Sequence, residues 1–235
     1  MLLSPLPFDS DLFGYPVGKC QIAGDWDEES FLRQAKDYRL VYIFSKKTLK
    51  NNSTCIHLAD TKLTFEKGIQ ELESSDPVIV PYSGELTEPL LNLALASGGF
   101  SRFHTDPGFV KGEYGKLYSL WIKNALAQNE VLIADQMSGF VSCSISGEKS
   151  NIGLIAVDKN QRGMGWGKRL ILAAENFAQK KGAKSMTIGT QEANIPAIAL
   201  YRSLGYEVVE RMYVYHYRPL GKIPSVEMTN SLPLK

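Results

Sequence analysis

The stretch from residue 151 to residue 182 constrains the fold more than any other part of the chain. It begins with the apolar run NIGLIAV, continues through Gly163, Gly165 and Gly167, and ends in an apolar stripe at helical spacing that stops before Gly182. Glycines at alternate positions let the backbone approach a ligand closely, and the amides that open a helix carry partial positive charge. A strand, a glycine turn and a helix start in this order predict a site for phosphate or pyrophosphate.

Two common nucleotide-binding loops do not fit this stretch. The dinucleotide fingerprint G-x-G-x-x-G needs a glycine where Lys168 stands, and it needs an early βαβ unit that the sequence does not show. A Walker A loop needs four residues between its glycines and then Lys with Ser or Thr. Here three residues separate Gly163 from Gly167, and Arg169 follows Lys168. The pattern that remains is R-x-x-G-x-G after a strand.

A second motif follows at a fixed distance. The stretch NIPAIALYRSLGY fits N-x-x-A-x-x-x-Y-x-x-x-G-Y, and together with the loop it resembles the GNAT superfamily of acyl-CoA-dependent N-acyltransferases. Glycine turns alone can be mere connections, whereas the two motifs together are specific. The resemblance implies an α/β (α+β) fold with a mixed, mostly antiparallel sheet flanked by helices. It also implies a V-shaped opening between the strands LIAVD and SMTIGTQ, and two closing strands within YEVVERMYVYHY.

The resemblance implies acetyl-CoA as cosubstrate and assigns its binding residues. Asn194 would contact the pantetheine arm, cap the following helix, or do both. Tyr201 would protonate the leaving thiolate, because a phenol with a reference pKa of about 10 stays protonated at neutral pH; the alternative is simple packing, the role expected for Tyr206. The backbone and loop residues expected to bind the cofactor are Ile155, Ala156, Val157, Arg162, Gly163, Met164, Gly165, Trp166, Gly167 and Lys168.

The general base stays open at this stage. Asp60 is the first choice because a narrower family resemblance, carried by segments on the substrate side, places a carboxylate at this position. Ordered water could also remove the proton, and Cys143 is expected in the core because direct attack needs no protein nucleophile. The other candidates for the base are Glu113, Glu192 and His104.

The substrate side carries a narrower resemblance. The segments FDSDLFG, SRF and YSLWIKNAL resemble the bacterial TDP-fucosamine acetyltransferase family, whose members acetylate the amino group of a dTDP-linked 4-amino-4,6-dideoxyhexose used in surface polysaccharides. Its pyrophosphate loop is expected to be shorter than VDKNQRGMGWG, which leaves the sugar open. Arg102 and His104 would bind phosphate. The candidates for stacking on thymine or the sugar are Phe103, Tyr114, Tyr118 and Trp121.

Two other functions remain as alternatives. A GNAT enzyme could acetylate a protein N-terminus, a polyamine or a drug amine, and an acidic pocket would favour those cationic acceptors, whereas an Arg-containing pocket favours an anionic one. The chain could also be a non-catalytic acyl-CoA-binding module, against which Tyr201 argues.

Composition limits the partners and the organisation. The net charge of +1 argues against nucleic acid or an anionic membrane, and the three cysteines lack metal or disulfide spacing, so no metal is expected. We see no signal peptide and expect a cytoplasmic protein. The expected parts are a small N-terminal α/β domain (1–77), a catalytic domain (78–218) and a tail (219–235). The stretch MYVYHY offers a strand that could pair across a homodimer.

Overall fold

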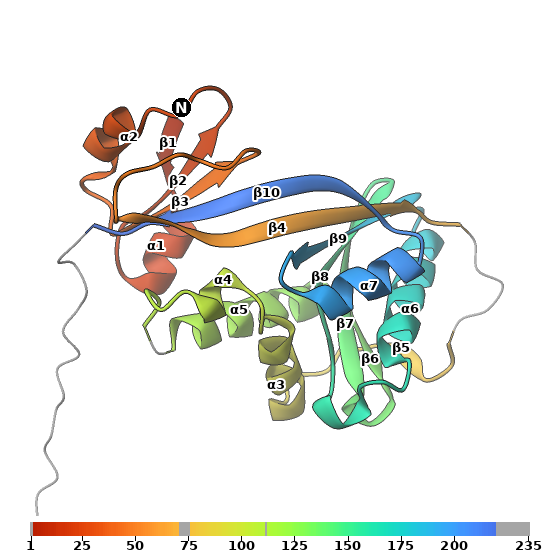
Figure 1. The fold of residues 1–235 in the computed structure, drawn as a ribbon. Coiled ribbons are helices and arrows are strands. Elements are labelled where there is room, and N and C mark those ends of the chain that lie inside the picture. The colour runs from red at the N-terminus through yellow and green to blue at the C-terminus, as the bar shows by residue number, and fades with distance from the viewer. Residues whose placement is uncertain (1, 71–75, 111, 220–235) are drawn as a thin grey trace, which may run out of the picture.

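The computed structural model describes residues 2–70, 76–110 and 112–219, and these residues form one sheet of ten strands with helices on both faces (Figure 1). The strand order is β1-β2-β3-β10-β4-β9-β8-β7-β6-β5. Neighbouring strands are antiparallel except the pairs β2–β3 and β8–β9. The strands are β1 Leu2–Pro5, β2 Val17–Ile22, β3 Leu40–Ser45, β4 Ile56–Gly68, β5 Ile79–Pro81, β6 Val131–Ala134, β7 Gly139–Ser146, β8 Lys149–Val157, β9 Ser185–Gln191 and β10 Glu207–Tyr217.

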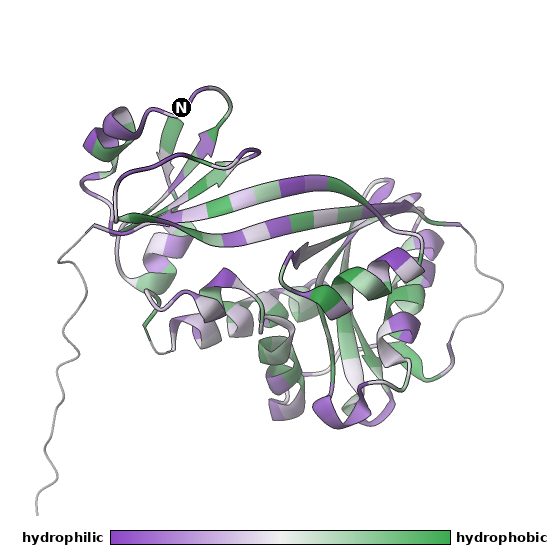
Figure 2. Ribbon diagram, viewed as in Figure 1, coloured by the Kyte–Doolittle hydropathy of each residue, from purple (hydrophilic) through white to green (hydrophobic). Residues whose placement is uncertain are grey.

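Helices cover the two faces of the C-terminal half of the sheet through two separate cores. On one face α3 (Glu88–Ser97), α4 (Arg102–Thr105) and α5 (Glu113–Ala127) pack against Phe140 and Leu154. On the other face α6 (Trp166–Lys180) and α7 (Ile195–Ser203) pack with Cys143, which is fully buried as expected. Figure 2 shows hydrophobic and hydrophilic residues interspersed along β4, as in a strand whose two faces differ.

The expected domain boundary does not interrupt the sheet. Strand β4, from the N-terminal part, lies between β10 and β9, which belong to the C-terminal part. The N-terminal part adds its own core, in which α2 (Glu28–Ala35) covers β2 and β3. The division at residue 77 therefore stays a prediction about folding units, and the expected tail lies outside the described residues apart from Pro219.

The strands β8 and β9 separate partway along their length. Their parallel pairing runs from Lys149↔Ser185 to Ile152↔Ile188 and then stops. At the same level β8 carries a bulge against β7, where Ser142 Oγ accepts a hydrogen bond of 2.8 Å from the Leu154 amide. Because a bulge bends its strand, β8 turns away from β9 and the predicted V-shaped opening forms.

Two expectations about local structure are corrected. The two closing strands are one, β10, whose pairing with β4 shifts in register at Val208/Glu210 and at Val214/Tyr215. Since β10 pairs with β3 on one edge and β4 on the other, MYVYHY has no free edge, and a homodimer would need another surface. The segment FDSDLFG forms most of the helix α1 (Pro7–Phe13), which starts on a proline and is capped by Gly14 with φ 75°.

Among the described helices, none combines the length and the apolar character needed to cross a bilayer.

Candidate functional site

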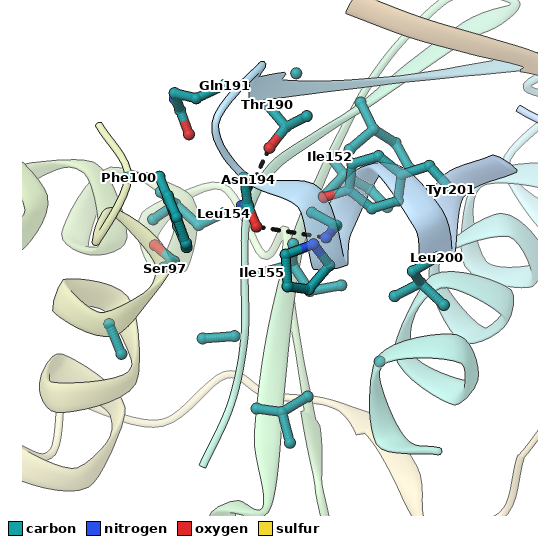
Figure 3. Close-up of a pocket in the computed structure, with 18 of the residues that line it drawn as sticks. Ser97, Phe100, Ile152, Leu154, Ile155, Thr190, Gln191, Asn194, Leu200 and Tyr201 are labelled. Carbon is teal, nitrogen blue, oxygen red and sulfur yellow. Dashed lines mark hydrogen bonds between the residues drawn. The ribbon is translucent and has the colours of Figure 1, made fainter. Parts of the chain in front are cut away.

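A single cavity of about 820 Å³ opens where β8 and β9 separate, and it extends to β4 and α4. Figure 3 shows Ser97 and Phe100 across this cavity from Tyr201 on α7. Among the residues predicted to bind the cofactor, Met164 lies outside its lining, and so do four of the candidates for the base or the acceptor site: His104, Glu113, Tyr114 and Glu192. The predicted residues that line it are Asp60, Arg102, Phe103, Tyr118, Ile155, Ala156, Val157, Arg162, Gly163, Gly165, Trp166, Gly167, Lys168, Asn194 and Tyr201.

The glycine loop has the geometry of an anion site. Gly163 and Gly165 have φ values of 79° and 83°, which side chains rarely adopt, and a Cβ at either would meet open space. Helix α6 begins directly after Gly165, so its first-turn amides have no partner within the helix. Arg162 bends back and donates from Nε to the Val157 carbonyl at 3.4 Å. The open loop and the helix start together fit a pyrophosphate.

The separated strand β8 offers a backbone edge beside this loop. Beyond Ile152 it has no pairing with β9, while β7 still pairs with Ile155, Ala156 and Val157 on the opposite edge. The edge that faces the cavity can therefore bond an extended amide chain such as pantetheine, in the manner of strand addition.

Asn194 joins β9 to the start of α7. Its Oδ1 accepts a hydrogen bond from the Ala197 amide at 3.4 Å, so the predicted cap is confirmed, and its Nδ2 donates to Thr190 Oγ1 at 3.2 Å (Figure 3). The same side chain lines the cavity, so capping and ligand contact are compatible.

Tyr201 is held in place by aromatic neighbours. Its ring packs edge-on against Phe65 with centroids 5.5 Å apart, and its hydroxyl points toward the side of the cavity where Asn194 lies (Figure 3). Within the described residues the hydroxyl has no hydrogen-bond partner, and burial raises the pKa of Tyr201 to about 12. The group therefore carries its proton at neutral pH. Tyr206 instead donates to Glu175 Oε1 at 2.8 Å and is part of the core, as expected.

Asp60 is the one candidate base on the cavity. Strand β4 carries an extra residue against β10 between Leu58 and Asp60, and such a bulge redirects the side chains beside it. Burial raises the pKa of Asp60 to about 6, although the nearby Arg102 charge lowers it. Its Oδ2 is fully buried without a hydrogen-bond partner in the described structure.

The other three candidate bases are engaged elsewhere. Glu192 pairs with Arg211 at 2.8 Å, and Glu113 accepts a hydrogen bond from the Val110 amide at 2.8 Å. His104 packs its ring 4.9 Å from that of Tyr114. None of the three lines the cavity.

Arg102 is a cation enclosed by aromatic rings. Its guanidinium lies 4.3 Å from the Phe103 ring centroid and 5.0 Å from that of Tyr42. Burial lowers its pKa, and its Nε is fully buried without a partner. In the part of the chain that the structure describes, Arg102 forms no ion pair, although the Asp60 and Asp9 carboxylates act on its charge from a distance. Its guanidinium can therefore contact an anionic ligand in the cavity.

Three of the four predicted stacking residues pack in the hydrophobic core and also line the cavity. Tyr118 is buried in the core of α5 and yet lines the cavity, as do Phe103 and Trp121, whereas Tyr114 does not. Lys62 is among the lining residues that the sequence analysis left unassigned, and it lies two residues beyond Asp60 on β4. The alternation of a strand would have placed the two on one face.

A cluster outside the cavity anchors α4. Asp106 follows this helix and lies 2.5 Å from His216 Nδ1 through its Oδ2, with His57 3.6 Å from its other oxygen. The Asp106 amide donates to the Arg102 carbonyl at 3.0 Å, so the cluster fixes the turn that carries Arg102. The three side chains are close enough to hold an ion, and the expectation of no metal stays a prediction.

Comparison with known proteins fits this geometry. Residues 99–206 match the model of the Acetyltransferase (GNAT) family. These residues are a GNAT acetyltransferase domain. The predicted fold, a mixed sheet flanked by helices, is confirmed.

Two curated relatives of the chain carry names that refer to a sugar or a polysaccharide. The chain is 30% identical over 132 residues to the dTDP-fucosamine acetyltransferase of Escherichia coli O6:H1, which covers 53% of the chain and 56% of that enzyme. It is 26% identical over 138 residues to the spore coat polysaccharide biosynthesis protein SpsD of Bacillus subtilis, covering 57% and 48%. The chain thus spans about half the length of these two relatives.

Solved structures share the fold of the chain at low sequence identity. A conserved protein of unknown function from Staphylococcus epidermidis superposes with a TM-score of 0.57 at 9% identity, covering 90% of this chain and 89% of that one. A tandem GNAT protein from the clavulanic acid biosynthesis pathway gives 0.51 at 11% identity, covering 87% and 76%.

Proposed function

We propose that the protein is an acetyl-CoA-dependent N-acetyltransferase that acts on the amino group of a dTDP-linked amino-deoxysugar. The observation that carries the proposal is one cavity lined by the glycine loop, Tyr201, Asp60 and Arg102. These groups supply, in order, an anion site for the cofactor, an acid, a base and a cation for the acceptor. A cytoplasmic location, expected from the sequence, stays a prediction of the same proposal.

The side chains divide the proton transfers between them. Acetyl-CoA supplies an activated acetyl group as a thioester. As the acceptor nitrogen bonds to the acetyl carbon and the carbon–sulfur bond breaks, Asp60 takes one proton from the amine and Tyr201 gives one to the departing sulfur. The proton on Asp60 then returns to Tyr201 through solvent, so the products are the acetamide and free thiol. Each transfer contributes about 10²- to 10⁴-fold.

Two observations support a nucleotide-linked sugar as the acceptor: the positive charge of Arg102 in the cavity and the names of two relatives. Arg102 presents to the cavity a guanidinium that makes no ion pair among the described residues, and guanidinium groups match phosphate oxygens in geometry. Two relatives carry names of sugar and polysaccharide metabolism. Tyr118 and Trp121 provide aromatic surface for thymine or the sugar ring.

A panel assay tests the proposal. The protein is incubated with acetyl-CoA and dTDP-linked 3-amino and 4-amino sugars, a neutral amino sugar, spermidine and a short peptide, and thiol release is followed. Turnover is expected with a nucleotide-linked sugar. Turnover of spermidine or the peptide alone would replace the proposal with the second candidate, a GNAT enzyme for cationic amines, which only the Asp60 carboxylate favours.

Cofactor binding without turnover of any amine would point to an acyl-CoA-binding module. Tyr201 argues against that function, because its protonated hydroxyl on the cavity has no structural partner among the described residues.

A further inference from the structure

Lys62 presents a charge to the cavity that the mechanism above does not use. It lies on β4 between Asp60 and Thr64, and all three line the cavity because alternate residues of a strand share a face. Its side chain crosses to β9, where the Cβ of an alanine at Gly189 would lie 3.2 Å from Cε and 3.8 Å from Nζ. The ammonium therefore lies beside the place where β8 and β9 separate.

The charged side chains that line the cavity around Lys62 are mostly cations. Asp60 is the one carboxylate among the described residues that line the cavity. Across the described structure neither Lys62 nor Arg102 forms an ion pair. The remaining lining cations, Arg162 and Lys168, belong to the glycine loop. Among the residues that line its acceptor end, the cavity thus holds two cations and one carboxylate. A second carboxylate, Asp9, acts on the Arg102 charge from outside the lining, and among the described residues Asp60 is the one carboxylate that acts on Arg102 from the cavity side.

Two buried polar atoms, one on Arg102 and one on Asp60, indicate that a ligand binds in this part of the cavity. The Nε of Arg102 is fully buried without a hydrogen-bond partner, as is Oδ2 of Asp60. Buried polar atoms in native proteins are almost always bonded, to protein, water or ligand. Two unsatisfied atoms of opposite sign beside a free ammonium indicate a ligand that carries both acceptor and donor groups.

We infer that Lys62 acts with Arg102 as the second cation for the phosphate groups of the acceptor, and that it selects anionic over neutral amines. The inference rests on the proposed function and names a specificity residue for it. Lysine binds phosphate as a point charge and arginine binds it through a fork, so the pair suits a diphosphate. Asp60 remains free for the amine.

The missing side chain of Gly189 leaves the space that the end of the Lys62 side chain occupies. A methyl group at 189 would meet only the end of this flexible side chain and would shift it by a few tenths of an ångström. The variant Gly189→Ala therefore moves the charge without removing it, whereas Lys62→Met removes the ammonium and keeps an unbranched apolar side chain that is shorter by one atom.

Calorimetry with thymidine diphosphate tests the inference. The protein is first saturated with CoA, so that the glycine loop is occupied and the probe reports on the acceptor end. Loss of one charge-assisted contact weakens binding by about 10- to 100-fold, which is expected for Lys62→Met. Lys62→Arg should lose less, and Gly189→Ala should lose a few-fold. Lys123→Met, an exposed lysine on α5 outside the cavity, should bind like wild type.

The results separate this inference from the proposed function. Wild-type affinity in folded Lys62→Met, checked by circular dichroism, would overturn the role of Lys62. So would equal turnover of neutral and nucleotide-linked amino sugars, although N-acetyl transfer to a sugar would stand. Lack of turnover with every amine, while thymidine diphosphate binding depends on Lys62, would instead overturn the proposed function.

Discussion

Asp60 and Arg102 line the same cavity, and each keeps one fully buried polar atom, Oδ2 and Nε, without a hydrogen-bond partner in the described structure. They carry opposite charges and influence each other's pKa, yet they form no ion pair. A purely structural pair would be expected to bond directly. The arrangement suits a ligand with a cationic or neutral amine at one group and an anion at the other.

Replacing Asp60 by asparagine should separate activity from stability. We expect kcat to fall by about 10²- to 10⁴-fold, because the base is lost while the shape is kept. Burial raises the folded pKa of Asp60 from 3.8 to about 6, so the folded state binds the proton more tightly and stability is lost as pH rises between these values. The asparagine variant should therefore be more stable at neutral pH by about 1–2 kcal/mol after allowance for solvent, or about 3–6 °C in Tm. Calorimetry should show this gain vanishing in acid, and a lower Tm at neutral pH would contradict the account.

The pH dependence of turnover should report the same group. Asp60 accepts a proton only when ionised, so kcat should rise with pH and level off above about 6. Tyr201, with its pKa raised to about 12, stays protonated across the assay range and adds no falling limb near neutrality. Steady-state kinetics from mildly acidic to mildly basic buffers measure the profile. An acidic limb that persists unchanged in Asp60→Asn would assign it to another group.

Tyr201→Phe removes the proposed acid and keeps the ring that packs on Phe65. We expect kcat to fall by about 10²- to 10⁴-fold while KM for acetyl-CoA changes little. Tyr206→Phe is the matched control: it removes the hydroxyl bonded to Glu175 and should lower stability more than kcat. Unchanged turnover in Tyr201→Phe would remove the acid role.

Gly165→Ala should weaken CoA binding. Gly165 has a φ of 83° directly before α6, so a side chain there strains the loop that presents the amides. Gly147→Ala imposes comparable strain at φ 59°, in the turn between β7 and β8 and away from the cavity lining, and serves as the control. Calorimetry with CoA should show weaker binding in the first variant only. Equal affinities in the two variants would contradict the loop's role.

Local sequence motifs made much of the candidate site predictable. The features that depend on which strand residues pair with each other could not be predicted from the sequence. The glycine loop, Asn194 and Tyr201 lie within two contiguous stretches whose spacing fixes their geometry. Lys62 was missed because its approach to the cavity depends on which residues of β4 pair with β9. The bulge before Asp60 and the single strand β10 likewise arise from long-range pairing that periodicity does not encode.

The sequence also failed to predict two short elements of secondary structure, β5 and α1. Strand β5 has three residues and helix α1 has seven, too few for a periodic pattern to emerge. Both lie in stretches rich in proline and glycine, which predict turns.

The position of the CoA sulfur relative to the Tyr201 hydroxyl tests the central claim most directly. A crystal structure with CoA and thymidine diphosphate should place the pyrophosphate on the amides that open α6 and the sulfur within hydrogen-bond distance of that hydroxyl, with the nucleotide phosphates near Arg102. A complex in which CoA binds elsewhere, or in which its sulfur lies away from Tyr201, would contradict the account.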